Sequence, residues 1–199
     1  MSAPSIVSQK SDFFSLFGLP RKLWIEMSAL EKKFLELSWK LHPDKSVNAS
    51  AQEQALSLKR SSEMNDAYRV LRDPVARVEY LLRIEDMRKE GEHKQQAPPE
   101  LLEEVFELNE SLDELREAKS AGGDLAALKS RLESAETNFQ EKLDEVDSQL
   151  LETARRWDAA VDANAGDSDR KGIMVRLNEL LNRRSYIRNL VTNVQKELT

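Results

Sequence analysis

Residues 30–45 read LEKKFLELSWKLHPDK, and the amino-terminal architecture follows from them. Pro43 lacks a backbone N–H and fixes φ, and it disfavours helical ψ at His42, so a helix that reaches this point must end. The apolar residues ahead of it recur at helical spacing and form one stripe: Leu30, Phe34, Leu37 and Leu41. The pattern predicts an amphipathic helix that ends in a stiff, exposed corner, and such a corner suits contact with a partner better than burial in a core.

A second helical stripe lies beyond the corner and stops at Asp73-Pro74. Its members are Ala55, Leu58, Ser61, Met64, Tyr68 and Leu71. Two antiparallel helices on either side of His42-Pro43-Asp44 would bury these stripes against each other as a helical hairpin. The short segment DFFSLFGL at residues 12–19 would add aromatic side chains to the same small core.

The carboxyl-terminal part predicts three further helices. Gly122-Gly123 and Asn164-Ala165-Gly166 separate them. The second helix, at about residues 125–161, repeats apolar residues at steps of three and four, which is typical of a coiled-coil seam. We expect an antiparallel three-helix bundle, with a dimeric coiled coil as the alternative. The expected organisation is a flexible terminus at 1–10, a first domain at 11–86, a linker at 87–98 and the bundle at 99–199.

Several stretches of this chain resemble the J-domain co-chaperones, and more narrowly the HscB family of iron–sulfur co-chaperones. The matching stretches are DFFSLFGLP at 12–20, LHPDK at 41–45, MNDAYRVLRDP at 64–74, Arg77, and YLL at 80–82. A further stretch, ELNESLDEL at 107–115, resembles the start of the family's second domain. The resemblance implies an all-α protein in which a J-domain helical hairpin at 11–86 precedes a bundle that binds the client.

The resemblance also implies a chaperone-binding site. The tripeptide His42-Pro43-Asp44 would stimulate ATP hydrolysis in a DnaK/HscA-type chaperone. Lys33 and Lys40 lie seven residues apart and share a helical face, and Lys45 follows the corner. Such cations would guide the encounter with an acidic surface of the chaperone, chiefly through the association rate. The alternative is that these lysines form an ordinary solvated face.

The first bundle helix carries a second candidate site. Leu102 and Phe106 each fall one position after a residue of the apolar stripe, so they widen the apolar surface toward one edge. Acidic residues border that edge, and an apolar patch with a charged rim is typical of protein-binding surfaces. The alternative is a wide stripe that packs against two neighbouring helices. By the resemblance, five residues align with positions that contact the iron–sulfur scaffold protein: Leu102, Phe106, Glu107, Glu110 and Leu180.

Composition and charge exclude several kinds of site and ligand. The chain has no cysteine, so it forms neither a disulfide nor a thiolate metal site. Residues 1–86 hold 13 basic and 12 acidic residues and the remainder holds 17 and 24, so the acidic charge lies in the bundle, which argues against nucleic acid as a ligand. No apolar run has the length of a membrane helix or a secretory signal. We expect a cytoplasmic, bacterial-type protein, monomeric or weakly dimeric, with no cofactor and no metal site.

The resemblance to the HscB family implies a co-chaperone that stimulates the ATPase of a DnaK/HscA-type chaperone and delivers an iron–sulfur scaffold protein to it, and the composition agrees with this. We do not expect an enzyme, because no nucleophile or phosphate-binding loop accompanies His42 and Asp44. One alternative is a general J-domain protein that recruits a DnaK chaperone to another client. The other is a structural coiled-coil protein.

Overall fold

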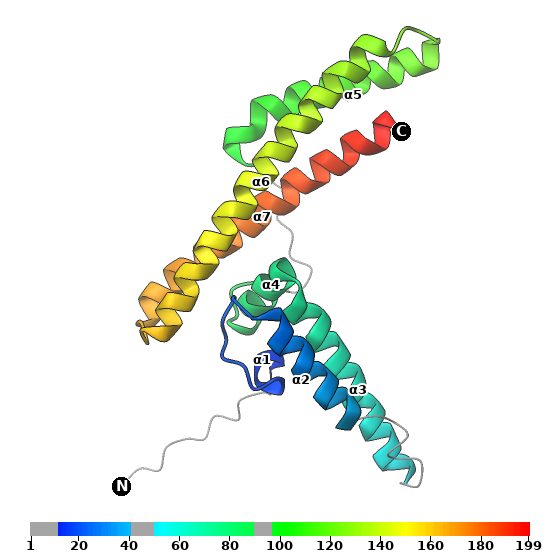
Figure 1. Cartoon of the computed structure of the whole chain (residues 1–199). Helices are drawn as coiled ribbons and strands as arrows, with labels where there is room; N and C mark the ends of the chain where they lie inside the picture. The colour runs from blue at the N-terminus through cyan, green and yellow to red at the C-terminus, as the bar shows by residue number, and fades with distance from the viewer. Residues whose placement is uncertain (1–11, 41–49, 90–96) are drawn as a thin grey trace. The chain divides into compact units, whose positions relative to one another are not determined.

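The computed structural model describes residues 12–40, 50–89 and 97–199, and every regular element within them is a helix (Figure 1). Contacts divide the chain into two compact units. The first combines the described part of Met1–Arg88 with Ala154–Arg170, and the second combines Lys89–Thr153 with Lys171–Thr199. No helix of the described ranges is both long and apolar enough to span a bilayer.

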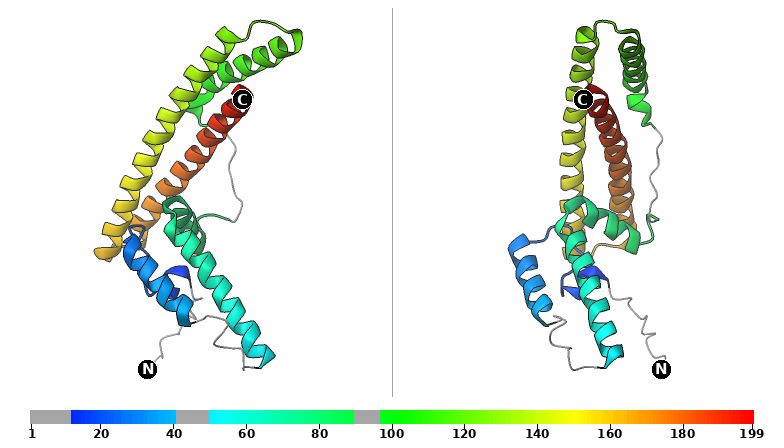
Figure 2. Two further views of the ribbon diagram at one scale, coloured as in Figure 1. Left: turned by 45° about the vertical axis from the view of Figure 1, so that its right-hand side comes forward. Right: turned by 90° about the vertical axis from the view of Figure 1, so that its right-hand side faces the viewer.

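The first unit contains the predicted helical hairpin. Its helices are α1 (Phe13–Leu16), α2 (Met27–Lys40), α3 (Ala51–Arg72) and α4 (Pro74–Ile84). Helices α2 and α3 lie side by side in all three ribbon views, and α3 also contacts α1 and α4 (Figures 1 and 2). The core side chains come from all four helices and the turn after α1: Phe14, Phe17, Leu30, Met64, Ala67, Leu71, Val78, Leu81 and Leu82.

The first turns of α3 differ from the sequence pattern. Ala55 and Leu58 are exposed, although they belong to the predicted stripe. Helix α3 has 22 residues whereas α2 has 14, and α3 extends past the end of α2 in each view (Figure 2). Burial on α3 therefore begins at Met64 among the described residues, where α1, α2 and α4 also pack.

Arg77 is a buried cation that joins three segments of this unit. Its Nε donates to the carbonyl oxygen of Leu71 at 2.7 Å, and its Nη1 donates to the carbonyl oxygen of Leu23. Burial lowers the pKa of the guanidinium, while the nearby carboxylates of Asp158 and Asp73 favour the charged form. The side chain thus ties the end of α3 and the segment before α2 to α4.

We expect Arg77→Met to lower the free energy of unfolding by about 2–5 kcal/mol, because two buried carbonyl groups lose their donor and each such loss costs about 1–3 kcal/mol. Urea unfolding measures the change. The matched control is Arg69→Met, since the Arg69 guanidinium is exposed and pairs with Asp66, three residues earlier on the same helix, at 2.8 Å. This control should change stability by less than about 0.5 kcal/mol. Equal effects of the two substitutions would contradict the role of Arg77.

The end of α6 (Ala126–Asp162) packs into the first unit. Trp157 is buried and its Nε1 donates to the carbonyl oxygen of Arg21 at 2.8 Å. The two carboxylate oxygens of Asp158 accept the backbone N–H groups of Leu23 and Trp24 at 2.6 and 2.7 Å. Burial raises the pKa of the Asp158 carboxyl, although both N–H groups favour its charged form. The predicted boundaries at 11–86 and 99–199 stay a prediction. The compact units differ from them chiefly because Ala154–Arg170 belongs to the first unit.

The second unit contains the predicted three-helix bundle. It begins with a short 3₁₀ helix, Pro99–Leu101, and is formed by α5 (Leu102–Ala121) with most of α6 and α7 (Asp167–Leu198). Helix α5 ends at Ala121, and Gly122 follows it with a φ of 69°, a conformation that favours glycine. The buried side chains come from all three helices: Leu108, Leu112, Leu115, Leu132, Phe139, Val146, Leu177, Ile187 and Val194. The prediction of an all-α fold with a hairpin and a bundle is confirmed.

Arg184 occupies a position on α7 where the apolar pattern calls for a hydrophobic side chain. Its guanidinium pairs with the carboxylate of Asp147 on α6, with Nη2 and Oδ2 3.2 Å apart. The charge is thus matched by a partner on the facing helix.

Candidate functional site

Four residues of the predicted chaperone site, His42, Pro43, Asp44 and Lys45, lie outside the described residues. The two helices that flank them in sequence are described. Helix α2 ends at Lys40, and α3 begins after Ser50, whose side chain and that of Glu53 form a reciprocal capping box. Both helices of the hairpin that was predicted around the tripeptide are therefore present.

The two described lysines of this site have different surroundings. The Lys33 ammonium is half-buried and donates to the carbonyl oxygen of Phe17 at 2.6 Å, so it ties α2 to the turn after α1. Gly18, in that same turn, has a φ of 62°. Lys40 is exposed at the end of α2. Of the two, Lys40 is the more exposed cation.

Helix α5 exposes the two apolar residues predicted for the scaffold site. The side chains of Leu102 and Phe106 are 55% and 71% exposed, whereas Leu108 and Leu112 are buried. The alternative of a wide stripe packed against two helices is wrong for Leu102 and Phe106. The two predicted acidic residues, Glu107 and Glu110, are also exposed on this helix, as is Glu103. Apolar side chains beside carboxylates can bind a protein surface that combines apolar and basic groups.

Leu180 is 1% exposed, so it does not present a side chain to solvent as Leu102 and Phe106 do. It lines a groove of about 710 Å³ in the second unit together with Leu102, Pro98 and Pro99. The structure therefore brings Leu180 and Leu102 to one groove, with Leu180 contributing buried surface. Glu107 lines a separate groove of about 270 Å³ between α5 and α6.

Metal-ligating side chains do not cluster within the described ranges. No group of three or more His, Asp or Glu residues there is placed to hold a metal ion, and the chain has no cysteine. The described side chains of the two candidate surfaces are apolar, acidic and basic groups.

Two family models match the chain: the DnaJ domain over residues 12–80 and the HSCB C-terminal oligomerisation domain over residues 97–164. The co-chaperone protein HscB homolog of Vibrio vulnificus (strain YJ016) is 33% identical over 149 residues, which cover 75% of this chain and 84% of that protein. The chain belongs to the HscB co-chaperone family. The HscB homolog of Vibrio parahaemolyticus is 38% identical over 102 residues, which cover 51% of this chain and 60% of that protein.

Two solved HscB structures share the fold. Chaperone HscB from Vibrio cholerae matches with a TM-score of 0.56 and 23% identity, over 93% of this chain and 96% of that one. Human co-chaperone protein HscB matches with a TM-score of 0.59 and 22% identity, over 99% of this chain and 85% of that one. The predicted resemblance to HscB-type J-domain co-chaperones, a class that acts in iron–sulfur cluster assembly, is confirmed.

Sequence reasoning missed part of the groove that this HscB-family chain forms beside Leu102. Arg176 and Arg183 line it together with Leu180, and Arg183 pairs with Glu100 at 3.2 Å. The signal was present, because positions 176, 180 and 183 follow helical spacing and share one face of α7.

Proposed function

We propose that this HscB-family chain stimulates the ATPase of a DnaK/HscA-type chaperone and delivers an iron–sulfur scaffold protein to it. The observation that carries the proposal is the combination of two features in one chain. Helices α2 and α3 flank His42-Pro43-Asp44 in the sequence, and α5 exposes Leu102 and Phe106 beside its buried apolar residues. The chain itself would bind neither nucleotide nor cluster and would catalyse no reaction. A cytoplasmic location and a monomeric or weakly dimeric state belong to the same proposal.

Stimulation follows from differential binding. The corner at His42-Pro43-Asp44 would bind the hydrolysis-competent arrangement of the chaperone better than the resting arrangement, and so would raise the population of the former. The scaffold, held on α5 by Leu102, Phe106, Glu107 and Glu110, with Leu180 supporting the groove beside them, would reach the chaperone in the same complex. The two surfaces lie on different helices of different compact units, so both partners can be tested separately.

The direct test is the ATPase rate of a purified DnaK-type chaperone with the chain alone, with an iron–sulfur scaffold alone, and with both. We expect stimulation by the chain alone and a larger stimulation when the scaffold is also present. An ATPase rate of the chaperone that is unchanged by the chain at every concentration would refute the proposal. Stimulation without any binding of the scaffold would favour a general J-domain protein.

Lys40→Glu tests whether the charge of Lys40 speeds association with the chaperone. We expect association with the chaperone to slow roughly two- to tenfold at low salt, because a charge pair about 4 Å apart in water is worth about 1 kcal/mol. The difference should shrink as salt screens the charge. Lys33→Glu is a poorer test, since it also breaks the hydrogen bond to Phe17. Stopped-flow association over a salt series measures the effect.

The control for net charge is Lys171→Glu, which changes the charge by the same amount at an exposed position of α7. It should leave the association rate within about twofold of wild type. Equal slowing by both substitutions would show that total charge, rather than Lys40, sets the rate.

A further inference from the structure

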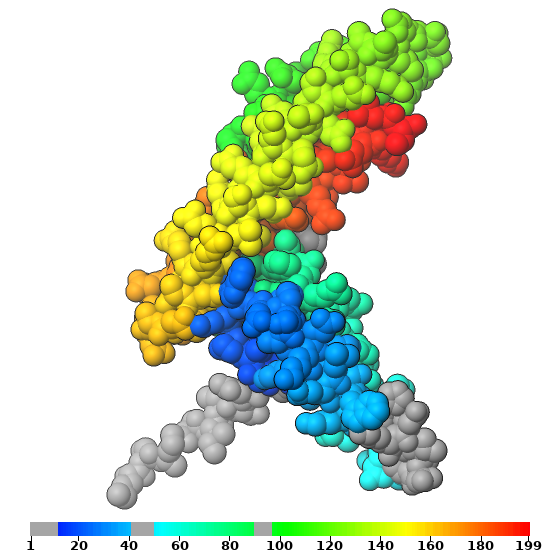
Figure 3. All heavy atoms as spheres, in the orientation of Figure 1, coloured from blue at the N-terminus to red at the C-terminus, as the bar shows by residue number. Residues whose placement is uncertain are grey.

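The segment between α1 and α2 is not helical, yet side chains from the end of α6 hold its backbone. The carbonyl oxygen of Arg21 accepts from Nε1 of Trp157, and the N–H groups of Leu23 and Trp24 donate to the carboxylate of Asp158. Both α6 residues lie in the last two turns of that helix, in the compact unit that contains α1–α4. The spheres of the end of α6 adjoin the blue spheres of this unit in Figure 3.

Leu23 is held through both of its backbone polar groups. Its N–H donates to Asp158 at 2.6 Å, and its carbonyl oxygen accepts from the guanidinium of Arg77. The Leu23 side chain is buried, and the Asp158 carboxylate attracts the Arg77 guanidinium. Because hydrogen bonds and charges act more strongly in such a partly buried network than in water, this network favours a single arrangement of the segment.

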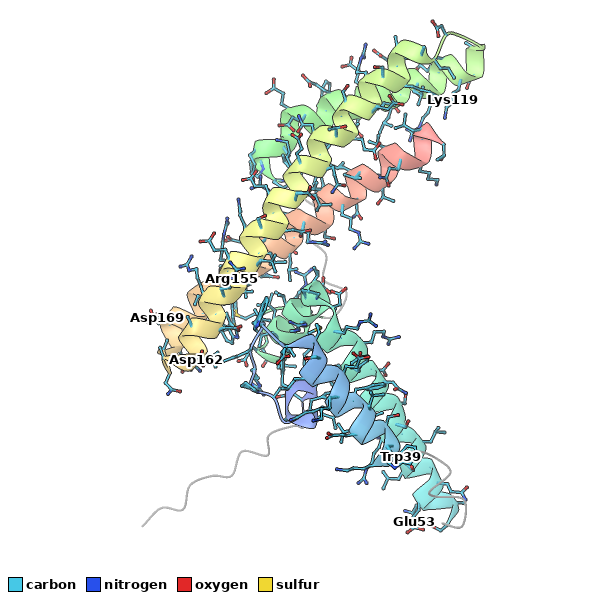
Figure 4. All side chains as sticks on the ribbon, viewed as in Figure 1. Trp39, Glu53, Lys119, Arg155, Asp162 and Asp169 are labelled. Atoms are coloured by element: carbon cyan, nitrogen blue, oxygen red, sulfur yellow. The ribbon has the colours of Figure 1, made fainter. Side chains whose placement is uncertain are left out.

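Asp162, one turn further along α6, contacts the same segment in a weaker way. Its carboxylate pairs with the Lys22 ammonium at 2.5 Å but is 65% exposed, and it is labelled at the end of α6 in Figure 4. Exposed ion pairs contribute little to stability. The contacts that fix the segment are therefore the bonds from Trp157 and Asp158 to its backbone.

The segment leads directly into a helix of the hairpin. Helix α2 begins at Met27, three residues after Trp24, packs on α3 and ends at the exposed Lys40. The path of the segment therefore sets where α2 enters the hairpin. The DnaJ-domain match ends at residue 80, so it does not include the side chains of α6 that fix this path.

We propose that Asp158 is a positioning residue for stimulation of the chaperone: the end of α6 completes the J-domain, and Asp158 holds the entry to α2 in the arrangement that the chaperone binds. This inference rests on the proposed function. A chain whose segment has left Asp158 binds only after the segment returns, so its apparent affinity falls with the fraction of chains in the binding arrangement. Stimulation then requires a folded α6, whose residues up to Thr153 belong to the unit with the proposed scaffold surface.

Substitutions at Asp158 should have graded effects. Asp158→Ala removes the acceptor of two N–H groups, and we expect the concentration of the chain for half-maximal ATPase stimulation to rise roughly tenfold or more. Maximal stimulation at saturation should stay within about twofold of wild type, because binding of the chaperone restores the arrangement. Asp158→Asn keeps one acceptor oxygen, so its half-maximal concentration should lie between those of wild type and Asp158→Ala.

The experiment uses the full chain and a purified DnaK-type chaperone, and it follows amide hydrogen exchange by NMR in the same variants. In Asp158→Ala the amides of Leu23 and Trp24 should exchange roughly tenfold faster or more, whereas the core amides of α3 should keep their wild-type rates. The matched control is Asp162→Ala, which removes a carboxylate from the same end of α6. Its half-maximal concentration should stay within about twofold of wild type.

An unchanged half-maximal concentration for Asp158→Ala overturns the positioning role while leaving the proposed function intact. An equal rise with Asp162→Ala overturns it as well, because the charge at the end of α6 would then be responsible. Faster exchange throughout α3 in both Asp158→Ala and Asp158→Asn would show that the residue is needed for folding of the whole unit, and the positioning role would be wrong. A wild-type chain that does not stimulate the chaperone would refute the proposed function and this inference together.

Discussion

Replacement of Asp44 by asparagine is expected to abolish stimulation of the chaperone's ATPase while the chain keeps its fold and its melting temperature. Asparagine has nearly the same shape as aspartate but carries no charge. A cation of the partner that loses a carboxylate in a closed interface is left unpaired, which costs about 2–5 kcal/mol. That loss corresponds to a reduction of roughly 30-fold to several thousand-fold. The sequence predicts that Asp44 lies in an exposed corner, and a substitution at such a position typically changes stability by no more than about 0.5 kcal/mol.

The control for Asp44→Asn is Asp86→Asn, the same chemical change at an exposed residue of the same unit. Asp86 has a φ of 55°, a conformation that asparagine also adopts readily. We expect this control to stimulate the ATPase as wild type does. Full stimulation by a well-folded Asp44→Asn chain would refute the J-domain mechanism.

Leu102→Ala/Phe106→Ala is expected to lose scaffold binding by roughly a thousandfold, if each residue acts as a hot spot worth about 2 kcal/mol. Because both side chains are more than half exposed, the bundle should melt close to wild type. Stimulation of the chaperone by the chain alone should be unchanged. A thermal melt, an ATPase assay and a scaffold titration on the one double variant give the three readouts.

Two control pairs separate binding from folding. Leu108→Ala/Leu112→Ala truncates buried residues of the same helix and should lower stability by about 2–5 kcal/mol for each residue. Leu151→Ala/Val175→Ala truncates exposed apolar residues elsewhere in the second unit and should bind scaffold normally. Normal scaffold binding by Leu102→Ala/Phe106→Ala would show that the client surface is elsewhere.

Local patterns predicted those features that depend on one helix at a time. The phase of the apolar stripe on α5 identifies Leu102 and Phe106 as lying off the buried face, and both are exposed. The break at Gly122 and the turn at Asn164, whose φ is 49°, follow equally from local chemistry. These features need no knowledge of what packs against the helix.

Features that depend on distant segments could not be predicted in this way. The bond from Lys33 to Phe17 depends on where α1 sits, and the exposure of Leu58 depends on the length of α2. Leu180 was predicted as an apolar contact, but it is buried, and it lines one groove with Pro99 and Leu102, which are distant in the sequence. Periodicity indicates which face of a helix is apolar; it does not indicate which neighbour covers that face.

The pairing of Asp158 with the backbone of Leu23 has a consequence for biosynthesis. The two residues are 135 positions apart in the chain. At about 5–20 residues per second, a ribosome adds Asp158 roughly 7–27 seconds after Leu23. During that interval the segment before α2 has emerged from the ribosome without the carboxylate and the tryptophan that later pack on it. The amino-terminal unit therefore completes its native contacts only after most of the bundle has been translated.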